Sequence, residues 1–198
     1  MEIIPAVLTD DPRQAREWLE GIKKSGKFSR VQIDFIDGKY ADNKTIEPEE
    51  VDMTPYLELG FDAHLMVVEK NLEKYVRQAK KVGFDRIIAQ MESIGHPGEL
   101  AGLALDVHTG TDILEPYLPG LEVVVVMAVE SGFGGQEFDP KVIKKIRVLS
   151  GLRREKNYRY RICVDGGVEQ DRLAELEAAG ADEVAVGAAR VLSWTDAE

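Results

Sequence analysis

Short apolar runs recur along the chain, and most of them precede a stretch in which apolar residues have helical spacing. The clearest run starts at Val123, where four valines and Met127 follow one another without a polar residue. A run of this kind is typical of a strand buried on both faces of a parallel sheet. Further strands are predicted over residues 3–8, 30–36, 61–66, 85–90, 101–106, 158–164 and 183–186.

Helical segments fit between most of these strands. They are predicted over residues 10–24, 48–59, 71–82, 109–118 and 170–179, with another helix that starts at Pro140 and a short last helix that opens at Gly187. Pro55 is expected to interrupt the second of these helices. The stretch between Met91 and the next strand is too short for a full helix, and Gly95 and Gly98 break its periodicity. We therefore expect the fourth helix to be shortened or missing.

The order of these elements predicts the fold class. Strands that alternate with helices, with no hairpin signal between them, indicate an α/β protein with a parallel sheet. Eight strands favour a (β/α)8 TIM barrel, and a doubly wound open sheet is the alternative. The length of 198 residues and the hydrophobic content of 44% fit one barrel domain, which we expect to cover residues 1–198.

Composition narrows the class of partner. The net charge of −11 argues against a broad surface for nucleic acid or for an anionic membrane, because both need an excess of lysine and arginine. No apolar run approaches the roughly 18 residues needed to cross a bilayer, and no signal segment precedes the first strand. The single cysteine, Cys163, excludes an intrachain disulfide. We expect a cytoplasmic protein whose partner is a small molecule.

Three ionisable side chains stand near the carboxyl ends of predicted strands, namely Asp34, His64 and Asp165. Burying an unpaired carboxylate is costly, so Asp34 needs a metal, a cation or a proton-transfer role, unless it belongs to a structural ion pair. His64 can likewise be a core residue with satisfied hydrogen bonds. In a closed barrel the three side chains would meet at one mouth, where they could bind zinc, iron or manganese and exchange protons with a substrate.

Glycines follow three of the predicted strands, and they are Gly132, Gly134, Gly135, Gly166, Gly167 and Gly187. Glycines let backbone amides approach a phosphate without hindrance by a Cβ atom, although a flexible connection between strand and helix is the plainer explanation. In (β/α)8 barrels the loops after strands seven and eight often form a phosphate site. Thr9, at the end of the first strand, could contact a substrate or cap the helix that follows.

Several motifs carry a resemblance to a known family. They are VLTDD after the first strand, IDFIDG with DNKTI, AHLM, MAVESGFGGQ, VDGGV and VGAA. From about Ile3 to Val191 the chain resembles the ribulose-phosphate 3-epimerases, which implies an isomerase that interconverts D-ribulose 5-phosphate and D-xylulose 5-phosphate in the pentose phosphate pathway. The resemblance implies that Asp34 and Asp165 are the two acid/base residues. It also implies that both aspartates and His64 bind a divalent metal cation.

The resemblance assigns further residues to a phosphorylated ketose substrate. They are Thr9, His64, Met66, Met127, Gly132, Phe133, Gly134, Gly135, Gly166, Gly167, Gly187 and Ala188. Met66 and Met127 are expected to line the site, and Thr9 matches a substrate-contacting serine of the family. We also expect a homo-oligomer.

The chain departs from the family at three positions. Gln32 stands where the family has a histidine ligand, and a neutral amide coordinates transition metals poorly, so metal binding is expected to be weak or absent. Ile36 replaces a methionine, and Ala188 replaces a serine whose hydroxyl would reach the phosphate. These changes leave a second hypothesis open, a catalytically impaired barrel that binds sugar phosphates in a regulatory role. A third, a decarboxylase or aldol-type synthase, would require a DxKxxD motif, and residues 34–37 offer no lysine.

Overall fold

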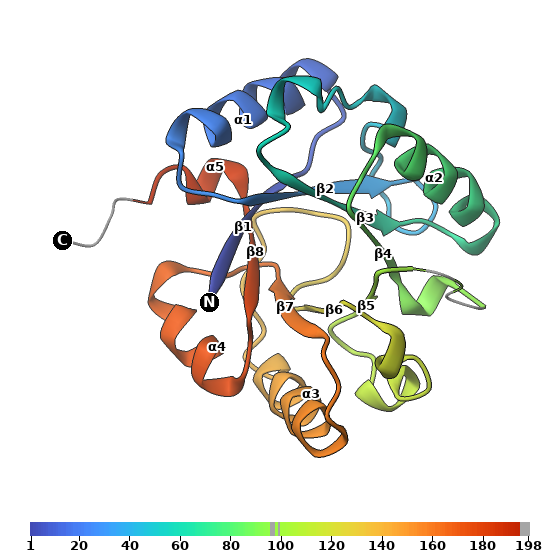
Figure 1. Ribbon diagram of the computed structural model, residues 1–198, viewed down its shortest axis with the longest axis vertical. Helices are drawn as coiled ribbons and strands as arrows, with labels where there is room; N and C mark the ends of the chain where they lie inside the picture. The colour runs from blue at the N-terminus through green and yellow to red at the C-terminus, as the bar shows by residue number, and fades with distance from the viewer. Residues whose placement is uncertain (96–97, 99, 195–198) are drawn as a thin grey trace.

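Eight parallel strands form a closed barrel in the computed structural model, which describes residues 1–95, 98 and 100–194 (Figure 1). The strands are β1 (Glu2–Val7), β2 (Arg30–Ile36), β3 (Gly60–Met66), β4 (Arg86–Gln90), β5 (Gly102–Leu105), β6 (Val123–Met127), β7 (Arg161–Asp165) and β8 (Glu183–Gly187). Neighbours along the chain pair in order, and β8 pairs with β1. The prediction of a (β/α)8 barrel is therefore confirmed, and the open-sheet alternative is wrong.

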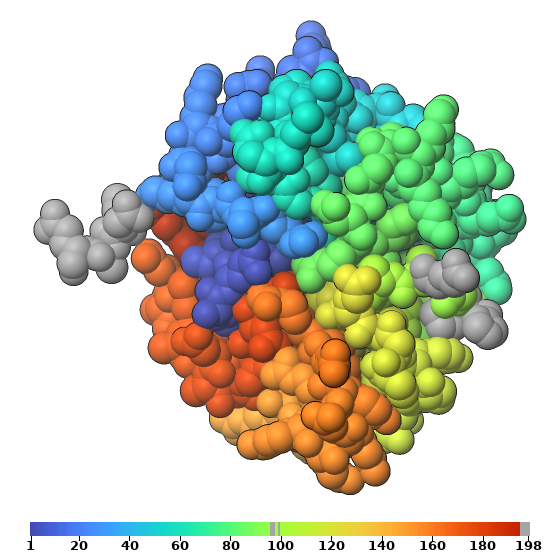
Figure 2. Space-filling model, viewed as in Figure 1, coloured from blue at the N-terminus to red at the C-terminus, as the bar shows by residue number. Residues whose placement is uncertain are grey.

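Alternate residues of each strand face the inside and the outside of the barrel, as the pleat of a strand requires. On β2, Val31, Ile33 and Phe35 belong to the apolar layer between strands and helices, whereas Gln32 and Asp34 face inward. The apolar cluster inside the barrel consists of Ala6, Ile88, Ala104, Val123, Val125, Met127, Cys163 and Ala185. Side chains fill the middle of the barrel, and no channel opens along the view of Figure 2. The interior is thus a packed core, as in other small barrels.

Five α-helices surround the strands in the described part of the chain. They are α1 (Pro12–Ser25), α2 (Glu69–Val82), α3 (Val142–Lys156), α4 (Leu173–Ala179) and α5 (Ala188–Val191). The first starts where the side chain of Asp11 accepts a hydrogen bond from the Arg13 amide and ends at Gly26, whose φ of 63° closes the helix. No helix in the described residues is both long enough and apolar enough to cross a membrane.

Two predicted helices are wrong in type, because only 3₁₀ turns form there. Residues 48–59 contain η1 (Pro48–Glu50) and η2 (Thr54–Tyr56), and residues 109–118 contain η4 (Thr111–Leu114), followed by η5 (Leu118–Gly120). Proline lacks a backbone donor and opposes continuation of an α-helix. Pro48 is the first residue of η1, Pro55 lies within η2, and Pro116 lies between η4 and η5.

The fourth helix is missing from the described residues between β4 and β5. A single 3₁₀ turn, η3 (Met91–Ser93), follows β4, while residues 96, 97 and 99 lie outside the part of the chain that the structure describes. In Figure 1 the sector between α2 and α3 contains short turns in place of long helices. The prediction of a shortened or missing fourth helix is confirmed for the described residues. The helix predicted from Pro140 begins slightly later, at Val142, and the Asp139 carboxylate accepts a hydrogen bond from the Lys141 amide in the turn before it.

An ionic network closes the end of the barrel at which the strands begin. The buried Asp62 accepts hydrogen bonds from Arg30 Nη1 at 2.6 Å and from Arg86 Nε at 2.9 Å. Glu183 binds the same Arg86 guanidinium through both oxygens, at 3.0 Å each, and also accepts a hydrogen bond from Arg161. Because each buried carboxylate has guanidinium partners, the charges are compensated where solvent is excluded.

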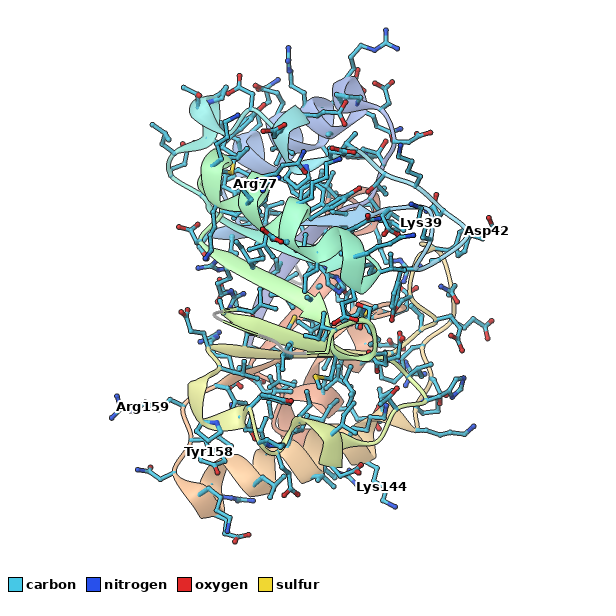
Figure 3. The ribbon with its side chains drawn as sticks, turned by 90° about the vertical axis from the view of Figure 1, so that its right-hand side faces the viewer. Lys39, Asp42, Arg77, Lys144, Tyr158 and Arg159 are labelled. Carbon is cyan, nitrogen blue, oxygen red and sulfur yellow. The ribbon has the colours of Figure 1, made fainter. Side chains whose placement is uncertain are left out.

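The opposite end of the barrel carries the loops that follow the strands. Figure 3 shows Lys39 and Asp42, in the loop after β2, at this end, while Tyr158 and Arg159, which precede β7, lie at the closed end. In (β/α)8 enzymes the chemistry takes place at the carboxyl ends of the strands. The open end is therefore where a site should be sought.

Candidate active site

A cavity of about 450 Å³ opens among the carboxyl ends of the strands and the loops after them. Most of the residues nominated from the sequence line it, and they are Asp34, Met66, Met127, Gly132, Phe133, Gly134, Gly135, Asp165, Gly166, Gly167, Gly187 and Ala188. The closed barrel brings them together from five different strands and their loops.

Two of the residues nominated as substrate contacts, Thr9 and His64, do not line the cavity. Thr9 donates a hydrogen bond to Gln14 Oε1 at 2.5 Å and accepts one from the Asp11 amide at 3.1 Å, so its hydroxyl holds the start of α1. His64 is fully buried beneath the cavity wall. The contact of Thr9 with a substrate stays a prediction, and the structure favours the capping alternative that the sequence left open.

Asp34, His64 and Asp165 converge below the cavity. His64 Nδ1 lies 3.2 Å from Asp34 Oδ1 and 3.4 Å from Asp165 Oδ2. In the register of the barrel Asp34 stands opposite His64 on β3, which explains their approach. The two carboxylates are almost buried yet reach the cavity wall, so they can meet both the imidazole and a bound molecule.

Burial and charge shift the pKa values of this group. Burial would lower the pKa of His64, but hydrogen bonds to Asp165 and Asp34 outweigh burial and raise the pKa to about 10. Burial raises the pKa of Asp34, and the nearby Asp165 carboxylate adds to the rise, whereas hydrogen bonds from His64 and Gln32 oppose it. The two carboxyl groups therefore favour the protonated form of the imidazole, against the effect of its burial.

Gln32 places its amide nitrogen at the centre of this group. Gln32 Nε2 donates to Asp34 Oδ1 at 2.8 Å and to Asp165 Oδ2 at 2.7 Å. It also lies 3.3 Å from His64 Nδ1. Two donors and two carboxylate oxygens thus alternate around a small ring. An amide nitrogen cannot coordinate a metal, so in this orientation Gln32 stabilises the carboxylates as a neutral donor.

Gln90 contacts the other ring nitrogen of His64. Gln90 Nε2 lies 3.2 Å from His64 Nε2 and 3.1 Å from Ser131 Oγ, whereas the buried Gln90 Oε1 has no partner among the described residues. When His64 Nε2 carries a proton, the amide can accept a hydrogen bond from it by turning Oε1 toward the ring. This contact holds the ring with Nδ1 directed at the two carboxylates.

The donor set below the cavity fits a divalent cation. One atom each from Asp34, His64 and Asp165 lies within 4.8 Å of the others, and all three residues are buried. Two carboxylate oxygens and an imidazole nitrogen suit zinc, iron and manganese. The three side chains nominated from the sequence therefore form a candidate metal group, and Gln32 adds no nitrogen to it.

Loops after three strands are joined above the cavity. Asn43 Nδ2, in the loop after β2, donates to the carbonyl of Gly132 at 2.7 Å. The Asp106 carboxylate, after β5, accepts hydrogen bonds from the hydroxyls of Tyr40 and Ser131. These contacts tie the loop of residues 37–45 to the glycine loop after β6.

The glycine loops require glycine for steric reasons at two positions. Gly166 and Gly167 have φ values of 102° and 66°, which other residues rarely adopt. A Cβ atom on Gly167 would lie 2.5 Å from the Phe138 amide nitrogen. At Gly187, by contrast, an added Cβ would meet no atom within 4 Å. The first pair shapes the wall, and Gly187 leaves space open.

Comparison with protein families gives one match over nearly the whole chain. The Ribulose-phosphate 3 epimerase family matches residues 2–191. The chain belongs to the ribulose-phosphate 3-epimerase family. Its similarity to the ribulose-phosphate 3-epimerase of Synechocystis sp. is 33% identity over 94% of this chain and 86% of that protein. The ribulose-phosphate 3-epimerase of Bacillus subtilis is 30% identical over 96% of this chain and 91% of its own.

Solved structures of other enzymes share the fold. Thiamine phosphate pyrophosphorylase from Pyrococcus furiosus superposes with a TM-score of 0.56 over 98% of this chain and 88% of that chain, at 17% identity. Phospho-2-dehydro-3-deoxyheptonate aldolase from Thermotoga maritima gives 0.58 over 94% of this chain and 59% of that chain, at 12% identity. At these identities the likeness concerns the barrel alone. Membership in the epimerase family rests on sequence.

The structure adds residues that the motifs of the epimerase family did not reveal. Gln14 and Trp18 of α1 and Arg190 of α5 line the cavity. Gln90 lies beneath it, beside His64. For Gln90 a signal was present, because it is a polar residue two positions after Ile88, which faces the barrel interior. Arg190 offered a weaker signal, a cationic residue shortly after the glycine that ends β8.

Proposed function

We propose that the chain interconverts D-ribulose 5-phosphate and D-xylulose 5-phosphate. The observation that carries the proposal is a pair of carboxylates, Asp34 and Asp165, in the wall of a cavity whose rim consists of glycine loops. An epimerisation next to a ketone needs a proton acceptor and a proton donor, and the two aspartates supply both. Family membership and the names of the relatives support the same reaction.

In the proposed reaction one aspartate removes the proton from carbon 3 of the ketose. The electrons of the C–H bond move toward the carbonyl oxygen at carbon 2 and give an enediolate. The other aspartate then returns a proton to the opposite face of carbon 3, which inverts the centre. His64 and Gln32 hold the carboxylates in place through the hydrogen bonds described above.

A divalent cation would be held by Asp34, His64 and Asp165. When bound, it supplies a positive charge that stabilises the negative oxygen of the enediolate. Without it, the donors that face the carboxylates are His64 Nδ1 and the amide of Gln32. Its identity as zinc, iron or manganese is a matter for metal analysis.

A barrel that has lost catalysis is not favoured. Both aspartates and His64 retain their mutual contacts in spite of the substitution at Gln32. The decarboxylase or aldol-type alternative is also not favoured, because residues 34–37 lack the lysine of its motif.

Solvent exchange tests the proposed reaction. Purified protein incubated with D-ribulose 5-phosphate in D₂O is expected to introduce deuterium at carbon 3 and to form D-xylulose 5-phosphate, both followed by NMR. The same sample without protein controls for spontaneous exchange. Exchange at carbon 1 with none at carbon 3 would indicate a different isomerase and contradict the proposal.

Gly187→Ala tests where the phosphate lies. The added methyl group meets no protein atom, so folding should be unaffected, but it enters the space that the phosphate would occupy. We expect KM to rise about tenfold, equivalent to about 1.4 kcal/mol, with kcat little changed. Gly151→Ala in α3 is the matched control, since its Cβ also meets no atom and it lies outside the cavity. Equal KM values in both variants would place the phosphate elsewhere.

Three expectations about partners and location stay predictions. The homo-oligomer can be tested by light scattering of the purified chain. The absence of nucleic-acid binding rests on the net charge of −11 and can be tested by gel shift. The cytoplasmic location rests on the single cysteine and can be tested by fractionation.

A further inference from the structure

Arg190 contributes a positive charge to the lining of the cavity. Of the lining residues in the described chain it is the only lysine or arginine, whereas Asp34, Glu130 and Asp165 all line the cavity with carboxylates. A phosphorylated ketose brings further negative charge into this space. A cation at the phosphate end would offset the repulsion that the carboxylates exert.

The position of the Arg190 guanidinium links two of the glycine loops. Arg190 follows Gly187 by three residues, and its Nη1 lies 3.3 Å from the carbonyl of Val168. Val168 directly follows Gly166 and Gly167. The charge therefore stands beside the loops after β7 and β8, where backbone amides are open to an anion.

The present partner of Arg190 is weakly held. Arg190 Nη1 lies 2.9 Å from Glu169 Oε1, and the two side chains are 33% and 55% exposed. Ion pairs at such exposure contribute little to stability, because water competes with both partners. The guanidinium can thus exchange this carboxylate for another anion at small cost. A phosphate in the cavity would offer more oxygens than Glu169 does.

Ala188 strengthens the case for a side-chain cation. It lies in the cavity wall between Gly187 and Arg190 and carries no hydroxyl that could donate to a phosphate oxygen. Backbone amides are then the remaining donors of this loop, apart from the guanidinium. An arginine presents several N–H donors in a planar fork that matches phosphate oxygens.

We propose that the guanidinium of Arg190 binds the phosphate group of the substrate. On binding, the phosphate replaces the Glu169 carboxylate as the partner of Arg190. The proposal rests on the proposed function, because it assumes that the cavity receives a phosphorylated substrate. Arg190 is a specificity-determining residue in this scheme: it favours the dianionic phosphate ester over the free sugar and takes no part in proton transfer.

Binding of inorganic phosphate tests the proposal without turnover. The dissociation constant, measured by calorimetry on the full chain, is expected to rise roughly tenfold in Arg190→Gln and less in Arg190→Lys. Glu169→Gln should bind phosphate more tightly than the wild type, because it removes the competing carboxylate. In the double variant the effect of Glu169→Gln should vanish, since no guanidinium is left for the two anions to share.

Several outcomes would overturn the assignment. One is the same phosphate affinity in wild type and Arg190→Gln, with melting temperatures that show both to be folded. Another is a wild type that binds no phosphate. A third is an equal gain in phosphate affinity from Glu169→Gln in the wild type and in Arg190→Gln. That result would show a general effect of the removed charge, and not an exchange of Glu169 for phosphate at Arg190. A protein that binds phosphate through Arg190 but does not epimerise ribulose 5-phosphate would refute the proposed function alone.

Discussion

Asp165→Asn is expected to lower kcat for epimerisation by about a thousandfold. The amide has the shape of the carboxyl group but cannot accept the proton that catalysis transfers. Asp165 lies in the cavity wall, and the amide oxygen of the variant can still accept the hydrogen bond from Gln32. Phosphate binding should be retained, because the glycine loops and Arg190 are unchanged in this variant. The measurement is a coupled assay of xylulose 5-phosphate formation.

Asp34→Asn is the matched variant, and the pair distinguishes two acid/base residues from one. If each aspartate serves one face of carbon 3, each variant should lose epimerisation yet retain slow deuterium exchange with one epimer, and the two should retain opposite epimers. Metal content must be measured in both, because both aspartates belong to the candidate metal group. Full epimerase activity in Asp165→Asn would exclude Asp165 as an acid/base group.

The strands of this protein could be predicted because the barrel imposes a strong pattern on them. A strand covered by helices outside and by the core inside must be apolar on both faces, which the run at Val123 shows most clearly. The inward polar residues also obey the pleat. Gln32 and Asp34 on β2, and Asp62 and His64 on β3, each stand two residues apart on the inward face. On β3, Asp62 belongs to the ionic network at the closed end of the barrel, and His64, two residues later, belongs to the candidate site.

The structure of the segments after β2 and β5 was predicted less well, because 3₁₀ turns form there in place of the expected α-helices. Apolar residues such as Tyr56 and Leu114 are buried there and suggest a helical stripe. Packing against the barrel buries them equally well from 3₁₀ turns. Prolines in these segments favour short 3₁₀ turns over an α-helix. A prediction from apolar periodicity alone does not take this effect of proline into account.

Some residues of the candidate site could likewise be predicted from the sequence, and others could not. Asp34, His64 and Asp165 could be predicted because each occupies the carboxyl end of a strand, and parallel strands bring such ends together. Arg190 depends on how α5 turns after Gly187, which no strand pattern specifies. Gln90 gains its meaning only from the side chain of His64 on the neighbouring strand. Residues that act through another side chain need coordinates before they can be recognised.

Gln32→His is expected to increase metal affinity by about tenfold to a hundredfold. Gln32 Nε2 lies within 2.8 Å of both carboxylates, so an imidazole at this position has its nitrogen close to the candidate metal group. It would replace a donor that competes with a cation by a ligand that binds one. Wild-type protein should hold metal substoichiometrically after dialysis. The variant should approach one metal per chain, measured by elemental analysis and by competition with a chelator.

Gln32→Leu separates the gain of a ligand from the loss of the amide. Leucine removes the hydrogen bonds to Asp34 and Asp165 without supplying a nitrogen, so the carboxylates lose a neutral partner and keep their contact with His64. If the missing ligand limits metal binding, the leucine variant should stay well below the histidine variant in affinity. If the amide limits it by occupying the centre of the group, both variants should gain alike. A wild type that already holds one tightly bound metal, with no change in Gln32→His, would mean that the amide turns its oxygen to the cation and serves as the fourth ligand.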